Sequence, residues 1–438
     1  MTPEHALRAA IRQHSAGDWR GAEIVYHEVL GVMPQNVDAL HFLGVLRHQQ
    51  GRTDEGVSFV QRALALAPAY VDAWSNLGNI FKESARLDEA EAAYRRALAL
   101  NEHHAAAWNN LGIVLRARGQ MGEAVEALRR AVHIAPAFAD AHFNLANAFR
   151  ECDCLAEAIV AYREVLKLNP GHTRAHHRLG YSLYRTGAHE EAAEIFRRWR
   201  VVEPENPIPA HMSAACSGDN VPERASDDYV RTTFNAFAAS FDEILLHRLD
   251  YEAPQQLLKV LGPALESSGS RYDILDAGCG TGLCGPLLKP FARTLTGVDL
   301  SPGMLAKARA REAYDHLYED EITHFLAARV ATFDVIASAD TLCYFGDLQP
   351  FARAAHSALR AGGWIAFTVE RSDDVETYRL QPHGRYCHAR MYVEGTLRDA
   401  GFEAIHVIPA VLRRELGNDV EGWVVRARVP DTSESPQH

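Results

Sequence analysis

The sequence of 438 residues lacks the long apolar stretches and the paired cysteines that mark several protein classes. It has no run of 18 or more apolar residues, which excludes a transmembrane helix and gives no reason to expect a membrane partner. Residues 1–14 are mixed and polar, unlike the apolar centre of a signal peptide, so we expect a cytoplasmic protein. The seven cysteines are scattered and form no disulfide framework, and Cys152 and Cys154 lack the second pair that a zinc site needs. We therefore expect no metal.

An excess of basic charge is missing as well. The net charge is −12, and residues 1–204 carry 23 basic against 24 acidic side chains, whereas residues 205–438 carry 22 against 33. Neither half has the basic surplus that the phosphate backbone attracts, so nucleic acid is not an expected partner. The length exceeds what one hydrophobic core usually supports, and this predicts two or three domains.

The first half repeats with a period of 34 residues. Proline marks one phase of the period, and a leucine followed by glycine or alanine marks another. An alanine, with an aromatic residue four positions later, marks a third. Representative members are Pro34, Pro68, Pro136, Leu77, Gly78, Leu111, Gly112, Ala90, Tyr94, Ala158 and Tyr162. A fixed period of this length indicates small structural units that pack on their neighbours.

This pattern of Trp-x2-Leu-Gly, Ala-x3-aromatic and Pro resembles the tetratricopeptide repeat. The resemblance implies six repeats over residues 3–206, each a pair of antiparallel helices. The repeats would stack into an all-α superhelix with a concave inner face. The small residues would allow the two helices of a unit to approach closely, and each proline would end its second helix.

One column of the repeat holds more than packing residues. Asn76, Asn110 and Asn144 lie 34 residues apart, and a side-chain amide can pair with a peptide backbone of any sequence. The column resembles the asparagine ladder in the repeats of O-GlcNAc transferase, which holds extended peptide. We therefore predict a peptide or protein partner in the groove. The alternative is that these amides bond neighbouring helices or water.

Residues 207–228 are rich in Pro, Ser, Ala and Asp without an apolar period, and this predicts a linker. Residues 229–261 then show helical spacing, with Phe234, Phe237 and Phe241 three and four residues apart. We expect a helical segment there. The domain that follows is expected to span 262–430, with a disordered tail at 431–438.

A glycine-rich loop follows a short apolar strand in the second half. The segment from Asp276 to Gly282 reads DAGCGTG, and its glycines permit a tight turn and close approach of a ligand. A second apolar strand ends at Asp299, 17 residues beyond Gly282, where a carboxylate is placed to accept ribose hydroxyls. The spacing GxGxG differs from the GxGxxG typical of dinucleotide oxidoreductases, which are the rival class.

These residues resemble the motifs of class I S-adenosylmethionine-dependent methyltransferases, over roughly residues 229–430. The resemblance implies an α/β Rossmann-like domain with a helical N-terminal lid, and it implies S-adenosylmethionine as the donor and S-adenosylhomocysteine as the product. It places an adenine-binding acid at Asp320 or Glu321, and we favour Glu321. The implied cofactor-binding residues are Asp276, Gly278, Gly280, Gly282, Asp299, Leu300, Asp320, Glu321 and Ala339.

The acceptor side carries a weaker pattern. The candidates for a general base are His388, Tyr344 and Asp340, because a hydroxyl acceptor must lose a proton. Arg385 is a candidate to clamp a carboxylate or phosphate, and Tyr386 and Tyr392 are further candidates to contact the substrate.

The sequence thus predicts a methyltransferase whose repeats recruit a peptide, protein or carrier-bound acceptor. One alternative is an O- or C-methyltransferase of small molecules whose repeats dimerise or scaffold. The other is a catalytically silent interaction protein. A homodimer is compatible with each of them.

Overall fold

The computed structural model describes residues 2–248, 250–266, 271–415 and 417–431. The chain divides into two compact units, the first ending at Ser182 and the second beginning at Leu183. Most of the expected tail, 432–438, lies outside the described residues. Among the residues described, no helix is long and apolar enough to cross a membrane.

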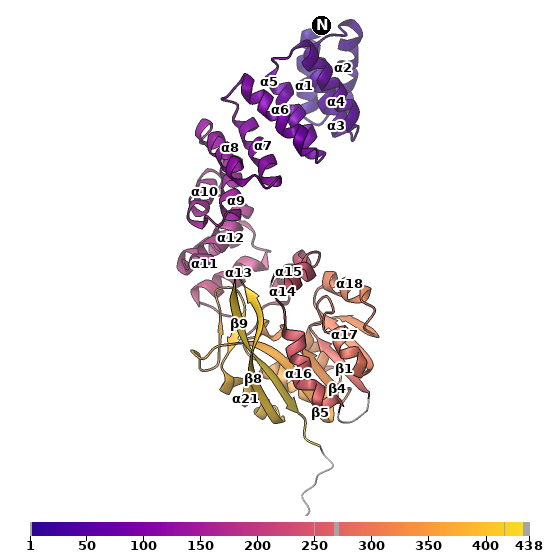
Figure 1. Ribbon diagram of the computed structural model, residues 1–438, viewed down its shortest axis with the longest axis vertical. Helices are drawn as coiled ribbons and strands as arrows, with labels where there is room; N and C mark the ends of the chain where they lie inside the picture. The colour runs from indigo at the N-terminus through magenta and orange to yellow at the C-terminus, as the bar shows by residue number, and fades with distance from the viewer. Residues whose placement is uncertain (1, 249, 267–270, 416, 432–438) are drawn as a thin grey trace, which may run out of the picture. The chain divides into compact units, whose positions relative to one another are not determined.

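The first unit is a series of antiparallel helix pairs (Figure 1). Small residues set the distance within each pair. A Cβ atom on Gly78 would lie 2.6 Å from the Tyr94 ring of the partner helix, so this approach requires glycine. The helices are α1 (Pro3–Ser15), α2 (Trp19–Val32), α3 (Val37–Gln49), α4 (Thr53–Leu66), α5 (Val71–Glu83), α6 (Leu87–Leu100), α7 (Ala105–Ala117), α8 (Met121–Ile134), α9 (Ala139–Glu151) and α10 (Leu155–Leu168), and α11 (Thr173–Arg185) crosses the unit boundary.

The odd-numbered helices line one side of this series. Helix α5 contacts α7, and α7 contacts α9, more extensively than successive even-numbered helices contact one another. Closer spacing on one side curves a stack of repeats toward that side. The odd-numbered helices, which carry the asparagine column, therefore form the concave layer.

The expected linker is wrong over its first half. After α12 (His189–Val202), residues 207–217 form α13 (Pro207–Ser217). Asn206 caps the helix by accepting the amide N–H of Ile208, and Gly218 ends it in a left-handed conformation with φ of 75°. These are ordinary helix start and stop signals. The composition rich in Pro, Ser and Ala did not indicate a linker here, because Pro207 and Pro209 lie in the first turn of the helix, where proline is tolerated.

The segment 227–266 forms three separate helices, where the sequence predicted one helical stretch over 229–261. They are α14 (Asp227–Phe237), α15 (Phe241–Arg248) and α16 (Ala253–Glu266). Ser226 caps α14 by accepting the amide N–H of Tyr229.

A nine-stranded sheet organises the second unit, in the order β3-β2-β1-β4-β5-β7-β6, with β9 antiparallel to both β5 and β8. This order confirms the expected doubly wound α/β fold. The strands are β1 (Tyr272–Ala277), β2 (Ala292–Asp299), β3 (His316–Glu319), β4 (Phe333–Ser338), β5 (Leu359–Arg371), β6 (Tyr378–Leu380), β7 (Tyr386–His388), β8 (Glu403–Glu415) and β9 (Asn418–Arg428).

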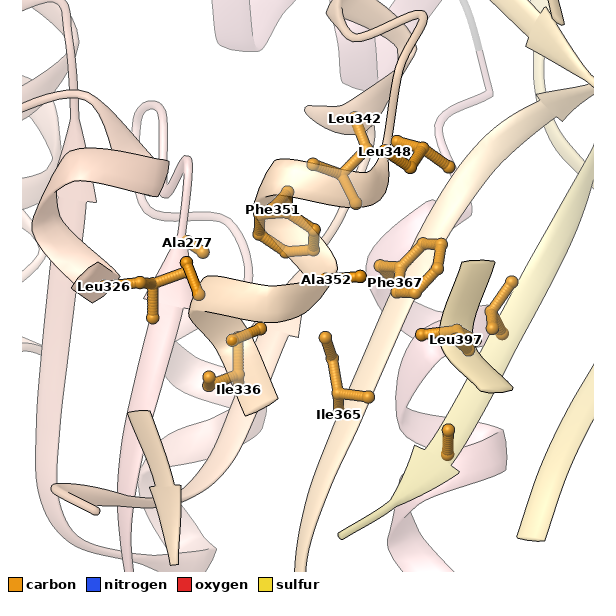
Figure 2. Packing of buried hydrophobic residues seen from close by; sticks show 14 of the residues in the cluster. Ala277, Leu326, Ile336, Leu342, Leu348, Phe351, Ala352, Ile365, Phe367 and Leu397 are labelled. Atoms are coloured by element: carbon orange, nitrogen blue, oxygen red, sulfur yellow. The ribbon is translucent and has the colours of Figure 1, made fainter. Parts of the chain in front are cut away.

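Alternate residues of the central strands face two helical layers. Ile336 and Ile365 pack against one layer with Phe351, as Figure 2 shows, whereas Val335 and Ala366 pack against the other. The first layer contains α19 (Ile322–Ala327), α20 (Gln349–Ala358) and α21 (Arg390–Asp399). The second contains α16 and α17 (Gly285–Leu288), while α18 (Pro302–Ala310) follows β2. Strands buried on both faces explain why their sequences are nearly continuous apolar runs.

Candidate functional site

The glycine loop lies at the carboxyl end of β1, where the strand order reverses and ligands bind in folds of this type. Gly278, Gly280 and Gly282 all have positive φ, of 76°, 53° and 86°. A Cβ atom on Gly278 would lie 2.3 Å from the Thr341 side chain, but one on Gly280 would meet nothing within 4 Å. The loop is thus tightly seated at Gly278 and open beside Gly280, where a ligand can approach the backbone.

Asp299 ends β2 and faces this opening. Its Oδ2 accepts the amide N–H of Gly280 at 2.9 Å, and its Oδ1 accepts that of Ser301 at 2.8 Å. Burial raises the pKa of the carboxyl group, and hydrogen bonds from the backbone of Ser301, Gly280 and Leu300 oppose that rise. Each oxygen keeps a lone pair, so the carboxylate can accept two vicinal hydroxyls.

Asp276 is buried beneath the loop, with 1% of its surface exposed. Its Oδ2 accepts the hydroxyl of Tyr314 at 2.6 Å, and burial raises the pKa of the carboxyl group to about 7. The buried carboxyl group is thus paired with Tyr314 beneath the loop, and its direct contact with a donor stays a prediction.

Tyr314 is a residue that the sequence analysis missed. Cβ atoms on Gly282, Gly285 or Gly297 would lie 2.8 to 3.0 Å from its ring, so the ring fills the space beneath the loop. The three glycines are all small because the same ring packs against them. They lie on two separate segments of the chain, so the sequence does not reveal that they share Tyr314 as a neighbour.

A cavity of about 310 Å³ lies beside Leu300, the residue that follows Asp299. Glu321 caps α19, with its carboxylate oxygens accepting the amide N–H groups of Thr323 and His324. Asp320 uses only Oδ1, which accepts the amide N–H of Glu321 and lies 2.8 Å from Nδ1 of His324. The geometry thus favours Asp320 over Glu321 for an adenine amino group. The cavity is lined by Leu300, Glu319, Asp320, Glu321, His324, Arg224, Asp227 and Arg231.

Two further residues missed from the sequence tie the preceding helices to this site. Asn235 of α14 holds the loop after β2, where its Oδ1 accepts the Ser301 hydroxyl at 2.6 Å. Asp242 of α15 accepts the Thr281 hydroxyl and an Arg311 N–H, each at 2.5 Å. These contacts place α14 and α15 beside the glycine loop, where a lid was expected.

Three acceptor-side predictions do not fit the geometry. His388 is fully buried, its Nε2 lies 3.1 Å from the Gly346 carbonyl, and burial lowers its pKa to about 4. This burial does not support the role of a base that the sequence predicted for His388. Tyr386 is also fully buried and donates to the Pro222 carbonyl at 2.6 Å, and Tyr392 donates to Asp347 at 3.0 Å. Both tyrosines position neighbouring segments.

Arg385 does not form an open clamp either. Its Nε donates to Glu370 at 2.6 Å, and its Nη2 donates to both oxygens of Glu415 at 2.7 Å. Arg413 joins the same network and donates to Asp340 at 2.5 Å. Both guanidinium groups are therefore already paired with carboxylates. Ala339 and Asp340 follow β4, so they lie at the same edge as the glycine loop.

The amides of the asparagine column are bonded to side chains of neighbouring repeats. Asn110 donates to Asn79 at 2.9 Å, and Asn144 donates to Asn109 at 2.9 Å, so amides of successive repeats are joined. Asn76 lies 2.9 Å from Nε2 of His41. The alternative that these amides bond neighbouring helices is thus realised in part, although Asn76, Asn110 and Asn144 all stay partly exposed.

Comparisons with known families match both halves. The family described as methyltransferase domain matches residues 275–367, and families described as tetratricopeptide repeat match 35–103, 75–137 and 143–207. A malonyl-[acyl-carrier protein] O-methyltransferase of Serratia marcescens is 31% identical over 27% of this chain and 48% of its own length. A ubiquinone biosynthesis O-methyltransferase of Xanthomonas campestris is 27% identical over 49% of this chain and 94% of its own. The chain thus spans about half the length of the malonyl-[acyl-carrier protein] relative.

Solved structures match the repeats. MamA is 26% identical and covers 37% of this chain and 94% of its own, with a TM-score of 0.34. YrrB, described as a tetratricopeptide-repeat protein with an unusual peptide-binding site, is 20% identical and covers 42% and 96%, with a TM-score of 0.37.

Proposed function

We propose that this chain, which combines tetratricopeptide repeats with a methyltransferase domain, transfers the methyl group of S-adenosylmethionine to an acceptor oxygen. The observation that carries the proposal is the open space beside Gly280, bordered by the Asp299 carboxylate. An oxygen acceptor is supported by these relatives, which are named as O-methyltransferases.

The residues present fit this donor. Asp299 would hold the ribose hydroxyls, Asp320 would hold the adenine amino group, and the loop at Gly280 would leave room for the amino-acid part. When bound, the donor supplies an already activated methyl group, so the chain's own task is to orient the acceptor and exclude water. Asn235 and Asp242 hold α14 and α15 beside the opening for that purpose.

Titration of the full chain with S-adenosylmethionine tests the proposal. We expect Asp299→Ala to lower donor affinity by about 2–4 kcal/mol, because it removes a charged partner of two hydroxyls. Asp399→Ala, which removes an exposed acid at the end of α21, serves as the matched control and should bind like the wild type. Absence of binding by the wild type, or equal binding by Asp299→Ala, contradicts the proposal.

For the repeats we propose recruitment of a peptide, protein or carrier-bound acceptor in the concave layer. The partly exposed amides of Asn76, Asn110 and Asn144 support a role in holding backbone. A second candidate is a small-molecule acceptor with repeats that scaffold, and the bonds of the asparagine column to neighbouring repeats favour it.

Transfer of labelled methyl from S-adenosylmethionine in host lysate separates the two candidates. Recruitment predicts label in protein, lost when Asn76, Asn110 and Asn144 are all changed to Ala. The small-molecule candidate predicts label in low-molecular-mass products, at equal rates for the full chain and for residues 183–438.

A further inference from the structure

Five charged side chains form one largely buried network near the carboxyl ends of β4, β5 and β8. They are Asp340, Glu370, Arg385, Arg413 and Glu415. Arg413 is 2% exposed and donates to Asp340, to Glu415 at 2.7 Å and to Glu370. Arg385 donates to Glu370 and Glu415, and these carboxylates therefore bridge the two guanidinium groups. The network is fixed by multiple charge-assisted hydrogen bonds, so it behaves as a rigid element of the site.

The charges in this network do not cancel. Asp340, Glu370 and Glu415 contribute three negative charges against the two positive charges of Arg385 and Arg413. His383 lies 3.3 Å from Glu370, but burial lowers its pKa to about 4, so the ring is neutral. The facing hydroxyl and thiol groups are neutral too, because burial raises the pKa of each; they belong to Tyr184, Tyr251, Cys343 and Tyr344. One negative charge remains.

Asp340 places that charge beside the glycine loop. It has φ of 55°, a strained conformation for a residue other than glycine, and its side chain is 17% exposed. The next residue, Thr341, donates to the Gly278 carbonyl at 3.1 Å. Asp340 therefore lies at the strand-order reversal, next to the position expected for the reacting end of the donor.

A group of aromatic side chains includes Tyr344, four residues after Asp340. The rings of Phe234 and Tyr344 are 5.4 Å apart and perpendicular, and Phe241 follows at 5.9 Å from Phe234. Tyr344 and Tyr251 are both half-buried, and neither hydroxyl has a hydrogen-bond partner among the residues described. Such hydroxyls can serve a ligand, and aromatic faces attract cations.

We propose that the acceptor carries a positively charged nitrogen, and that Asp340 binds it beside Tyr251 and Tyr344. A carboxylate or phosphate at this point would meet guanidinium groups already paired within a network of net negative charge. A cation would neutralise the remaining negative charge of the network and could contact the aromatic rings nearby. This inference rests on the proposed methyltransferase function and names its acceptor class.

Three phenols of similar size and different charge test the inference. They are tyramine, which is cationic, para-ethylphenol, which is neutral, and phloretate, which is anionic. Their dissociation constants are measured by calorimetric titration of the full chain saturated with S-adenosylhomocysteine. We expect tyramine to bind about tenfold more tightly than phloretate, with para-ethylphenol between them.

Asp340→Asn should reduce that preference to about twofold or less, because the network then carries no net charge. Asparagine tolerates positive φ, so the backbone at this site is retained. Asp399→Asn makes the same charge change on the surface and should keep the wild-type ranking.

Phloretate binding as tightly as tyramine, or no binding of tyramine at millimolar concentration, overturns the inference. A second result also overturns the inference. In it, Asp340→Asn keeps the preference for tyramine and binds S-adenosylhomocysteine normally, but loses affinity for S-adenosylmethionine. The Asp340 charge would then bind the sulfonium of the donor and not the acceptor. If S-adenosylhomocysteine itself does not bind, the proposed function fails first. A reversed ranking with that product bound leaves the proposed function intact.

Discussion

The hydroxyl of Tyr314 and the carboxyl group of Asp276 form a buried hydrogen bond of 2.6 Å under the glycine loop. A buried acid of this kind links loop geometry to protonation, because burial raises its pKa to about 7 while the tyrosine donor opposes the rise. At the scale of single residues, the loop is thus supported by a group that titrates near neutral pH.

This pair predicts a pH dependence of stability. The folded chain binds a proton on Asp276 up to about pH 7, whereas the unfolded chain releases it near its ordinary pKa of 3.8. The folded state therefore holds more protons in this interval, and the free energy of unfolding falls as the pH rises from about 4 to about 7. Urea denaturation at a series of pH values should show this fall in the wild type and a weaker one in Asp276→Asn. Parallel curves for the two proteins would refute the assignment.

At the scale of elements, α13 is joined to the hairpin β6–β7 and to α14 by a small set of contacts. Nε2 of His211 on α13 lies 2.8 Å from the carbonyl of Gly384, and its ring stacks on Tyr229 of α14 at 3.9 Å. Gly384 has φ of 89°, and a Cβ atom there would lie 2.9 Å from the Tyr229 hydroxyl. Three elements thus meet at a position where a side chain has neither backbone freedom nor space.

We predict that Gly384→Ala destabilises the second unit by about 2–4 kcal/mol, combining backbone strain with a steric clash. Gly218→Ala is the matched control, because Gly218 also has a positive φ, of 75°, but its Cβ would meet nothing within 4 Å. Its cost should be about 1 kcal/mol from strain alone. Chemical denaturation of both variants measures the difference, and equal losses would show that the contact contributes nothing.

At the scale of the whole molecule, the second unit begins before the methyltransferase family match, at Leu183. The segment after α13 is bonded to the acceptor side: the Glu223 carbonyl accepts the amide N–H groups of Gly346 and Asp347, and Ala225 donates to the Tyr344 carbonyl. The last helices of the repeat region and the segment that follows are thereby part of the second unit.

We accordingly predict that residues 183–438 bind S-adenosylmethionine like the full chain, whereas residues 229–438 bind it weakly or fail to fold. The shorter fragment loses α13 and the backbone partners of the loop that carries Tyr344. Donor titration and circular dichroism of both fragments provide the measurement. Full binding by residues 229–438 would show that the segment is a passive connector.

Features that depend on local order along the chain could be predicted from the sequence alone. The period of 34 residues indicated the helical repeats, and the loop from Gly278 to Gly282 with Asp299 indicated the family and the doubly wound fold. Both follow from neighbouring residues, because helix and strand periods and turn glycines act within one or two elements.

Which side chains contact one another could not be predicted in this way, because it depends on the fold as a whole. Asp276 is paired beneath the loop with Tyr314, which lies 38 residues further along the chain. The ring of His388 is buried against Gly346 and the rings of Tyr378 and Tyr392. Arg385 is neutralised by Glu370 and Glu415, which are 15 and 30 residues away in sequence. Burial and charge pairing depend on contacts between segments that are distant in sequence, so the residue pattern of one segment does not predict them.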